Sequence, residues 1–152
     1  MKILIYSDVH GNLPAFETML KEIGFCDGYL CLGDLVNYGP WSNECVDLAL
    51  SLPNSVILKG NHEDAFINRN YNGSNLLVKD FFNQTIESFD RFNEISHFQD
   101  SYQIKDYFCI HTIDNKNIYP DSVIHLDKNY IIGHSHHQFL IQNLMVHRHW
   151  QI

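Results

Sequence analysis

Five short apolar runs in this 152-residue sequence are each followed by side chains that could bind metal ions. These side chains offer imidazole nitrogens and carboxylate or amide oxygens without thiolates, a set that suits Zn, Mn, Fe or Ni better than a soft metal. Eight such side chains are too many for one tetrahedral ion, whereas two divalent ions that share a carboxylate would use them well. The residues are Asp8, His10, Asp34, Asn61, His62, His111, His134 and His136.

Each of these residues also has an ordinary structural explanation. His10 could be a turn histidine, and Asp34 could be a turn or helix-capping acid. Asn61 could form an Asx turn, and His111 could be a hydrogen-bonded core histidine. For any single motif the ordinary explanation is favoured. An ordered set, in which every member follows a predicted strand, is far less expected by chance, and we interpret it as one site.

The apolar runs are the elements that must position these side chains. Rich in Ile, Leu, Val, Tyr and Phe, they are typical of buried strands, and helices are predicted over residues 12–23 and 42–51. Asn12 and Pro14 suit the start of the first helix, and Ser42 suits the cap of the second. The order β-α-β-α-β favours a largely parallel sheet, and polar residues at the carboxyl ends of such strands meet at one edge.

The second half of the chain follows a different pattern. Apolar residues at helical spacing predict one long helix over 76–93, packed on the core or folded over the site. Two short strands around Lys105–Asp106 predict a hairpin. Two further strands are predicted around Gln142–Asn143. The length and the absence of a linker favour one domain over residues 1–152.

Composition restricts the function classes. The formal net charge of −8 argues against a nucleic-acid-binding surface, which would be basic. No apolar stretch approaches the ~18 residues that a membrane span needs, and the N-terminus does not read as a signal peptide. The four cysteines lack metal-binding or disulfide-scaffold spacing. We therefore expect a cytoplasmic protein with reduced thiols. The negative charge does not exclude a small anionic substrate, because bound metal cations can invert the local field.

The ordered motifs resemble those of the calcineurin-like metallophosphoesterase superfamily. The segment "GDLVNYGPWSNECVDL" also resembles the small bacterial phosphodiesterase-like branch of that superfamily. The resemblance implies an α/β fold, a four-layer α/β/β/α sandwich of two sheets. The superfamily pattern D-x-H, G-D, G-N-H-[DE], a strand-closing His and G-H-[ST]-H is present in order as Asp8-Val9-His10, Gly33-Asp34, Gly60-Asn61-His62-Glu63, His111 and Gly133-His134-Ser135-His136.

The resemblance also implies a role for each motif residue. Asp8, His10 and His136 would hold one divalent ion, and Asn61, His111 and His134 would hold the other. Asp34 would bridge the two ions. His62 would be a catalytic histidine that binds a phosphoryl oxygen or protonates the leaving group. The implied activity is phosphoester hydrolysis by a metal-bridging hydroxide, with Mn, Zn, Fe or Ni as the metals.

Departures from the superfamily pattern reduce the number of substrate classes that we expect. Phosphoprotein phosphatases of the superfamily have G-D-x-x-D-R-G, and this sequence has no arginine at the corresponding position. A phosphodiesterase is therefore favoured. A phosphomonoesterase, a nucleotide pyrophosphatase and a non-catalytic scaffold of the same fold remain the alternatives. Asn37 and Tyr38 lie where substrate contacts would fall, with a plain turn as the alternative, and Arg69 is a weak candidate for a phosphate contact.

The end of the sequence suggests a shortened second sheet. After the last motif the chain runs through "NLMVHRHWQI", which is shorter than the superfamily pattern. An uncovered sheet edge can pair with another chain, so a homodimer is a reasonable expectation. His134 and His136 are two residues apart, which would put both on one side of an extended segment.

Overall fold

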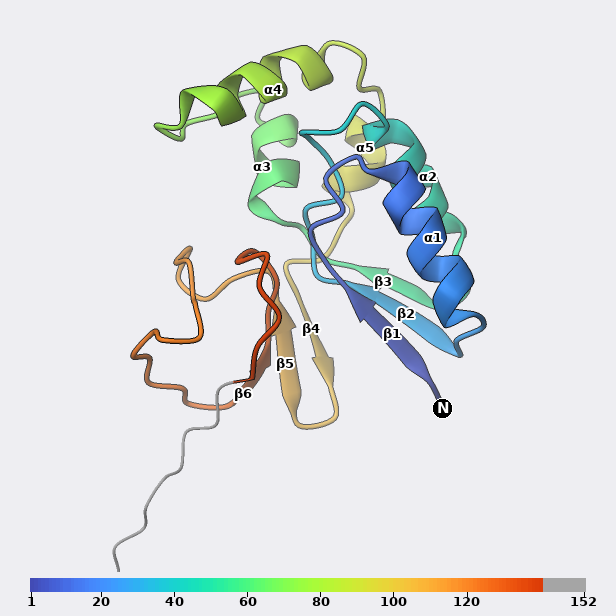
Figure 1. Cartoon of the computed structure of the whole chain (residues 1–152), viewed down its shortest axis with the longest axis vertical. Coiled ribbons are helices and arrows are strands. Elements are labelled where there is room, and N and C mark those ends of the chain that lie inside the picture. Colours follow the sequence, from blue (N-terminus) through green and yellow to red (C-terminus); the bar gives the residue numbers. More distant parts are fainter. Residues whose placement is uncertain (141–152) are drawn as a thin grey trace, which may run out of the picture.

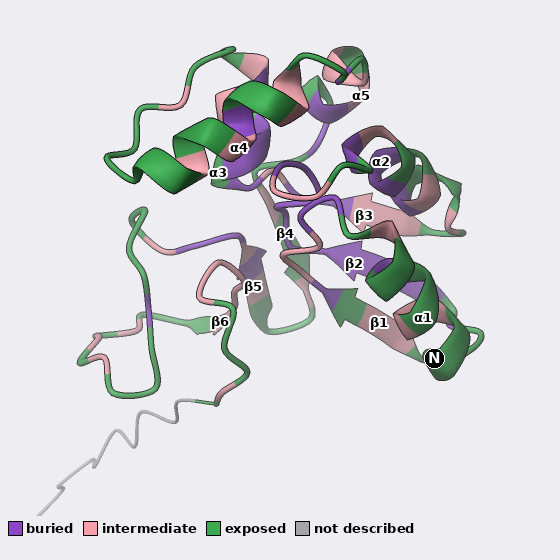
Figure 2. Cartoon of the chain, turned by 45° about the horizontal axis from the view of Figure 1, so that its top comes forward, coloured by how far each residue is buried: buried purple, intermediate pink, exposed green. Residues whose placement is uncertain are grey.

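The first three apolar runs form a parallel sheet (Figure 1). The structure, a computed structural model, describes residues 1–140. The strands are β1 (Ile3–Tyr6), β2 (Gly28–Cys31) and β3 (Ser55–Ile57), in the order β1-β2-β3. All four residues of β2 are buried, and Figure 2 shows this strand at the centre of the sheet. A strand that is buried on both faces explains the unbroken apolar run in the sequence.

Two helices cover one face of this sheet, α1 (Leu13–Ile23) and α2 (Ser42–Ser51), as the sequence predicts (Figure 1). The side chain of Asn12 caps α1 by accepting the N–H of Ala15 at 3.2 Å. The prediction that Ser42 caps α2 is wrong. Trp41 occupies the cap position, and the hydroxyl of Ser42 accepts the N–H of Asn37 at 3.1 Å instead.

A second sheet packs against the first, with β4 (Ser101–Ile104), β5 (Tyr107–Ile110) and β6 (Asn129–Ile131) in that order. The predicted hairpin is confirmed, because β4 and β5 pair antiparallel, while β5 and β6 pair parallel. Alternate side chains of β2 point to opposite faces of the first sheet and pack in two different hydrophobic cores. Tyr29 and Cys31 pack with the helices, whereas Leu30 packs with Cys109 of the second sheet. The α/β class and the two-sheet architecture are therefore confirmed.

The predicted single helix over 76–93 is wrong. The chain forms α4 (Leu76–Ile86) and, after a turn, α5 (Phe92–Ser96). Contacts from α2 hold the turn, since Asn43 donates to the carbonyl of Ser88 at 3.0 Å and accepts the N–H of Asp90 at 3.1 Å. These tertiary hydrogen bonds replace the backbone bonds that a continuous helix would make.

A short helix that the sequence pattern did not predict, α3 (Asn61–Ile67), follows β3 after residues 58–60. It lies beneath α4 in Figure 1 and packs Phe66 edge-on against Phe89, with ring centroids 4.9 Å apart. No helix among residues 1–140 is long and apolar enough to cross a membrane. The strands predicted around Gln142–Asn143 lie outside the described residues.

Candidate metal centre

All eight predicted donor residues lie together at the carboxyl ends of five strands. The loop after β1 carries two of them, the loop after β2 one, the start of α3 two, the residue after β5 one and the loop after β6 two. Three groups drawn from these residues have potential ligand atoms within 4.8 Å of one another. The groups are Asp8, His10 and His136; His10, Asp34 and His62; and Asp34, His111 and His134.

The backbone of these loops is left-handed at five donor positions. Asp8, His10, Asp34, His134 and His136 have φ between 50° and 71°. This region costs non-glycine residues roughly 1–3 kcal/mol each and persists where the surroundings enforce it. Backbone hydrogen bonds between the loops enforce this conformation, for example the bond from the N–H of His10 to the carbonyl of Asp34 at 3.0 Å. Such strain, gathered in one place, is typical of a functional site.

The last motif is a tight turn, so the prediction of an extended segment is wrong. The turn is closed at Ser135, whose N–H donates to the carbonyl two residues earlier at 2.9 Å. His134 and His136 nevertheless reach different partners. Nδ1 of His134 lies 3.2 Å from Nε2 of His111, and Nε2 of His136 lies 3.0 Å from Nε2 of His10.

Apart from His62, the donor residues form two groups on either side of the carboxylate of Asp34. In the first, Nε2 of His136 lies 3.4 Å from Oδ1 of Asp8, in addition to its contact with His10. In the second, Nε2 of His111 lies 3.1 Å from Oδ1 of Asn61. Oδ2 of Asp34 lies between the groups, 3.1 Å from His111 and 3.9 Å from His10.

The hydrogen bonds made by Nδ1 of His10 and of His111 indicate whether cations fit between the donor atoms of the two groups. Nδ1 of His10 faces the carbonyl of Val36 at 3.2 Å, and Nδ1 of His111 faces the carbonyl of Leu32 at 2.9 Å. A carbonyl only accepts, so each Nδ1 carries a proton and each Nε2 points into the site. Each Nε2 faces further acceptor atoms there. In a neutral ring this Nε2 has a free lone pair, and a divalent ion in each group would be coordinated by that lone pair and by the facing acceptors, so the residues fit two ions.

Burial keeps most of these imidazoles neutral and ready to coordinate. It lowers the pKa of His10 to about 4 and also lowers the pKa of His62 and of His134. Burial would raise the pKa of Asp34, but the hydrogen bond and charge of His111 hold it below the usual carboxylate range. Burial opposes protonation of His111, yet Asp34 raises its pKa to about 9. Metal binding at neutral pH would therefore release a proton from His111.

Glu63 organises the site, a role that the motif reading left unassigned. Its side chain is fully buried, and its two oxygens accept four backbone N–H groups. Burial and the charge of Asp34 raise the pKa of Glu63 to about 7, against the N–H donors, which lower it. The N–H groups belong to Gly60, Asp34, Leu35 and Val36, at 2.7 to 3.2 Å. The carboxylate thereby fixes the Asp34 loop onto the start of α3.

Glycine allows the same two segments to touch. Gly33 has φ of 110°, and a Cβ at this position would lie 2.6 Å from the nitrogen of Gly60 and 2.9 Å from Nδ1 of His111. A Cβ on Gly60 would collide with the carboxylate of Asp34. The G-D and G-N-H motifs therefore need their glycines for close backbone approach.

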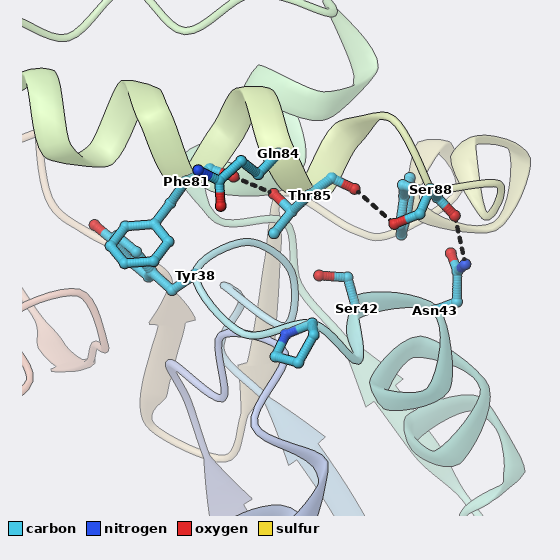
Figure 3. Close-up of a pocket in the computed structure, with 9 residues that line it drawn as sticks. Tyr38, Ser42, Asn43, Phe81, Gln84, Thr85 and Ser88 are labelled. Carbon is cyan, nitrogen blue, oxygen red and sulfur yellow. Dashed lines mark hydrogen bonds between the residues drawn. The ribbon is translucent and has the colours of Figure 1, made fainter.

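Asn37, for which the sequence predicts a substrate contact, lies beside His62. Its side chain is fully buried, and Nδ2 lies 2.8 Å from Nδ1 of His62. The amide oxygen accepts a hydrogen bond from the hydroxyl of Thr85 on α4 at 3.0 Å, and Figure 3 shows Thr85 on the face of α4 that looks toward Tyr38 and Ser42. With Asn37 as donor, neutral His62 carries its proton on Nε2. The structure thus makes Asn37 a positioning residue for His62.

Tyr38 borders the metal centre. Its ring lies 4.6 Å from that of His10 and 5.0 Å from that of His62. It also lies 5.6 Å from the ring of Phe81, and Figure 3 shows this pair. Arg69, a candidate for a phosphate contact, stacks 4.2 Å over Phe92 instead. Beside the donors is a cavity of about 360 Å³, lined by Asp34, Tyr38, Asn61, His62, Tyr71, Val78, Asn117, Tyr119, His134, Ser135 and His136.

The chain is similar to several known proteins. It is 41% identical over 63 residues to the uncharacterized protein MJ0912 of Methanocaldococcus jannaschii, an alignment that covers 40% of this chain and 26% of that protein. A metallophosphoesterase structure from Sphaerobacter thermophilus matches with a TM-score of 0.65 and 30% identity, covering 86% of this chain and 51% of that one. The hypothetical protein PH1004 of Pyrococcus horikoshii OT3 shares the fold, with a TM-score of 0.62, 17% identity and coverage of 80% and 60%.

The chain spans about half the length of the Sphaerobacter protein. A family model described as calcineurin-like phosphoesterase matches residues 1–151. That match covers nearly the whole chain, and the motif residues meet at one place in the fold. The chain therefore belongs to the calcineurin-like phosphoesterase family.

Proposed function

We propose that this chain hydrolyses phosphodiester bonds at a centre of two divalent metal ions. The observation that carries the proposal is the pair of donor groups on either side of Asp34, with Nε2 of His10 and of His111 directed into them. One ion would lie among Asp8, His10 and His136. The other would lie among Asn61, His111 and His134, and Asp34 would contact both.

In this proposal the metal donors, His62 and Asn37 have different roles in phosphodiester hydrolysis. When bound, the two ions supply Lewis acidity, which makes hydroxide available near neutral pH and offsets charge on the phosphoryl oxygens. The oxygen of water forms a bond to phosphorus as the water gives up a proton to solvent, the bond between phosphorus and the leaving oxygen breaks, and the leaving oxygen takes up a proton from solvent. His62 donates a hydrogen bond from Nε2 to the phosphoryl or leaving oxygen. Asn37 keeps that proton on Nε2 by occupying Nδ1.

The charges around the cavity support a phosphodiester rather than a phosphomonoester as the substrate. Neither lysine nor arginine is among the described residues that line the cavity. The nearby Lys116 and Arg69 contact Asp114 and Phe92 instead. With two carboxylates in the centre, the two ions leave only a small positive charge for substrate. A diester carries one negative charge, whereas monoesters and pyrophosphates carry more, and the described lining of the cavity contributes no lysine or arginine to neutralise the excess.

Paired substrates test this preference. Protein stripped of metal and reloaded with Mn²⁺ should hydrolyse bis(4-nitrophenyl) phosphate with a kcat/KM at least about tenfold above that for 4-nitrophenyl phosphate, because the monoester dianion lacks a counter-charge. Release of nitrophenolate measures both reactions, and the metal-free protein is the control. A higher kcat/KM for the monoester would contradict the diester assignment. No release from either compound would contradict the phosphoesterase itself.

A further inference from the structure

Tyrosines from three separate loops wall the cavity beside the donors. Tyr38 comes from the loop between β2 and α2, Tyr71 from the loop between α3 and α4, and Tyr119 from the loop between β5 and β6. Val78 of α4 adds an apolar surface. The motifs did not point to Tyr71 or Tyr119, and neither belongs to the two groups of metal donors. These tyrosines therefore line the cavity without belonging to the metal donor groups, and we infer that they contact substrate.

From this arrangement we propose that the cavity binds phosphodiesters whose retained ester group is planar and aromatic, as in a nucleoside. The inference rests on the proposed function and names the substrate class within it. Aromatic side chains bind planar rings through their faces and edges, largely regardless of the ring's identity. A simple alkyl ester would offer these side chains no planar ring to bind.

The cavity matches such a group in size, rigidity and charge. Its volume of about 360 Å³ admits a nucleoside beside a phosphate, since small-ligand pockets begin near ~300 Å³. The ring of Tyr38 packs against those of His62 and Phe81, so it is positioned before any ligand arrives. Asn117, in the same lining, offers an amide that can hydrogen-bond the polar edge of a base. The absence of lysine and arginine from the described lining favours an uncharged group over a second phosphate.

Two substrates that share a leaving group test the inference. Thymidine 5′-(4-nitrophenyl) phosphate and methyl 4-nitrophenyl phosphate carry the same single charge and release the same nitrophenolate, and differ only in the retained group. For the Mn²⁺-loaded protein we expect kcat/KM to be on the order of tenfold higher for the thymidine ester, mainly through a lower KM. Saturation-transfer NMR of metal-free protein with thymidine should show magnetisation reaching the thymine protons.

Matched variants assign the preference to the tyrosines. Tyr71→Leu and Tyr119→Leu should each reduce the ratio of the two kcat/KM values several-fold, whereas Tyr71→Phe and Tyr119→Phe keep the ring and should preserve most of it. Tyr102→Leu, at an exposed position on β4 outside the cavity, should leave the ratio unchanged. Equal kcat/KM for the two esters, or a ratio that both leucine variants leave intact, would overturn the inference and leave the proposed function standing. Failure to hydrolyse either ester would instead remove the proposed function.

Discussion

Replacing His62 with alanine should lower kcat for bis(4-nitrophenyl) phosphate about 10²–10³-fold while the protein keeps its metal ions. The reason is geometric. His62 lies beside the donor groups, but Nδ1 is occupied by Asn37, so the ring presents an N–H rather than a lone pair to the cavity. A group that donates to the developing charge affects turnover more than metal affinity. Steady-state kinetics and elemental analysis of the same preparations measure the two effects.

The control for this variant is His62→Gln, which can still offer an N–H donor and should recover part of the lost turnover. Asn37→Ala should cost less than His62→Ala, about 10–100-fold, because the ring stays but loses the partner that fixes its tautomer. If His62→Ala lost bound metal in proportion to activity, His62 would be a ligand. If kcat were unchanged, the catalytic assignment would be wrong.

Removing the carboxylate of Glu63 should destabilise the metal-free protein by roughly 3–5 kcal/mol. The change Glu63→Ala leaves four buried backbone N–H groups without an acceptor, and each unsatisfied group costs about 1–3 kcal/mol before any relaxation. The loop that carries Asp34 would also lose its anchor to α3. Urea denaturation monitored by circular dichroism gives the change in unfolding free energy.

Two comparison variants make the Glu63 measurement specific. Glu63→Gln keeps the side-chain volume and one acceptor oxygen, so it should lose less stability than Glu63→Ala. Glu17→Ala removes an exposed carboxylate from α1 and should change the unfolding free energy by less than about 0.5 kcal/mol. A loss below about 1 kcal/mol in Glu63→Ala would show that the four N–H groups find other acceptors, and that Glu63 does not hold the loop in place.

The sequence predicted the general frame because strand ends and ligand types follow simple rules. Apolar runs of strand length alternated with amphipathic segments, which indicated a parallel sheet, and polar residues at strand ends were expected to converge. That rule brought Asp8, Asp34 and His111 into one site although long stretches of chain separate them. The hairpin at Lys105–Asp106 followed equally from local pattern, since both of its strands lie next to each other in the sequence.

Features that depend on tertiary contacts could not be read from local pattern. The apolar stripe over 76–93 continues through the turn at Ser88, but side-chain bonds from Asn43 break the helix there. Burial of Asn37 was equally hidden, because its partner Thr85 lies 48 positions away along the chain. Only the position of Glu63 inside the G-N-H-[DE] motif could have signalled its role, and the pattern gave no reason for an acid at that place.

Left-handed backbone at the donor positions is a second property that periodicity does not encode. Spacing by two suggested that His134 and His136 share one side of a strand, yet φ of 71° and 54° turns the chain between them. Asp, Asn and His adopt this region more readily than most residues, so the same residue types that bind metal also tolerate the loop geometry. The same residues therefore provide the metal ligands and adopt the left-handed backbone of the loops.

Metal content tests the central claim most directly. Protein stripped of metal, equilibrated with excess Mn²⁺ at neutral pH and passed over a desalting column should contain two ions per chain by elemental analysis. Asp8→Ala and Asn61→Ala, each of which removes a donor from a different group, should each reduce the content toward one ion. Asp34→Ala should weaken both sites. Fewer than two ions at saturation in the unaltered protein, or two ions retained by all three variants, would contradict the assignment of two metal sites that share Asp34.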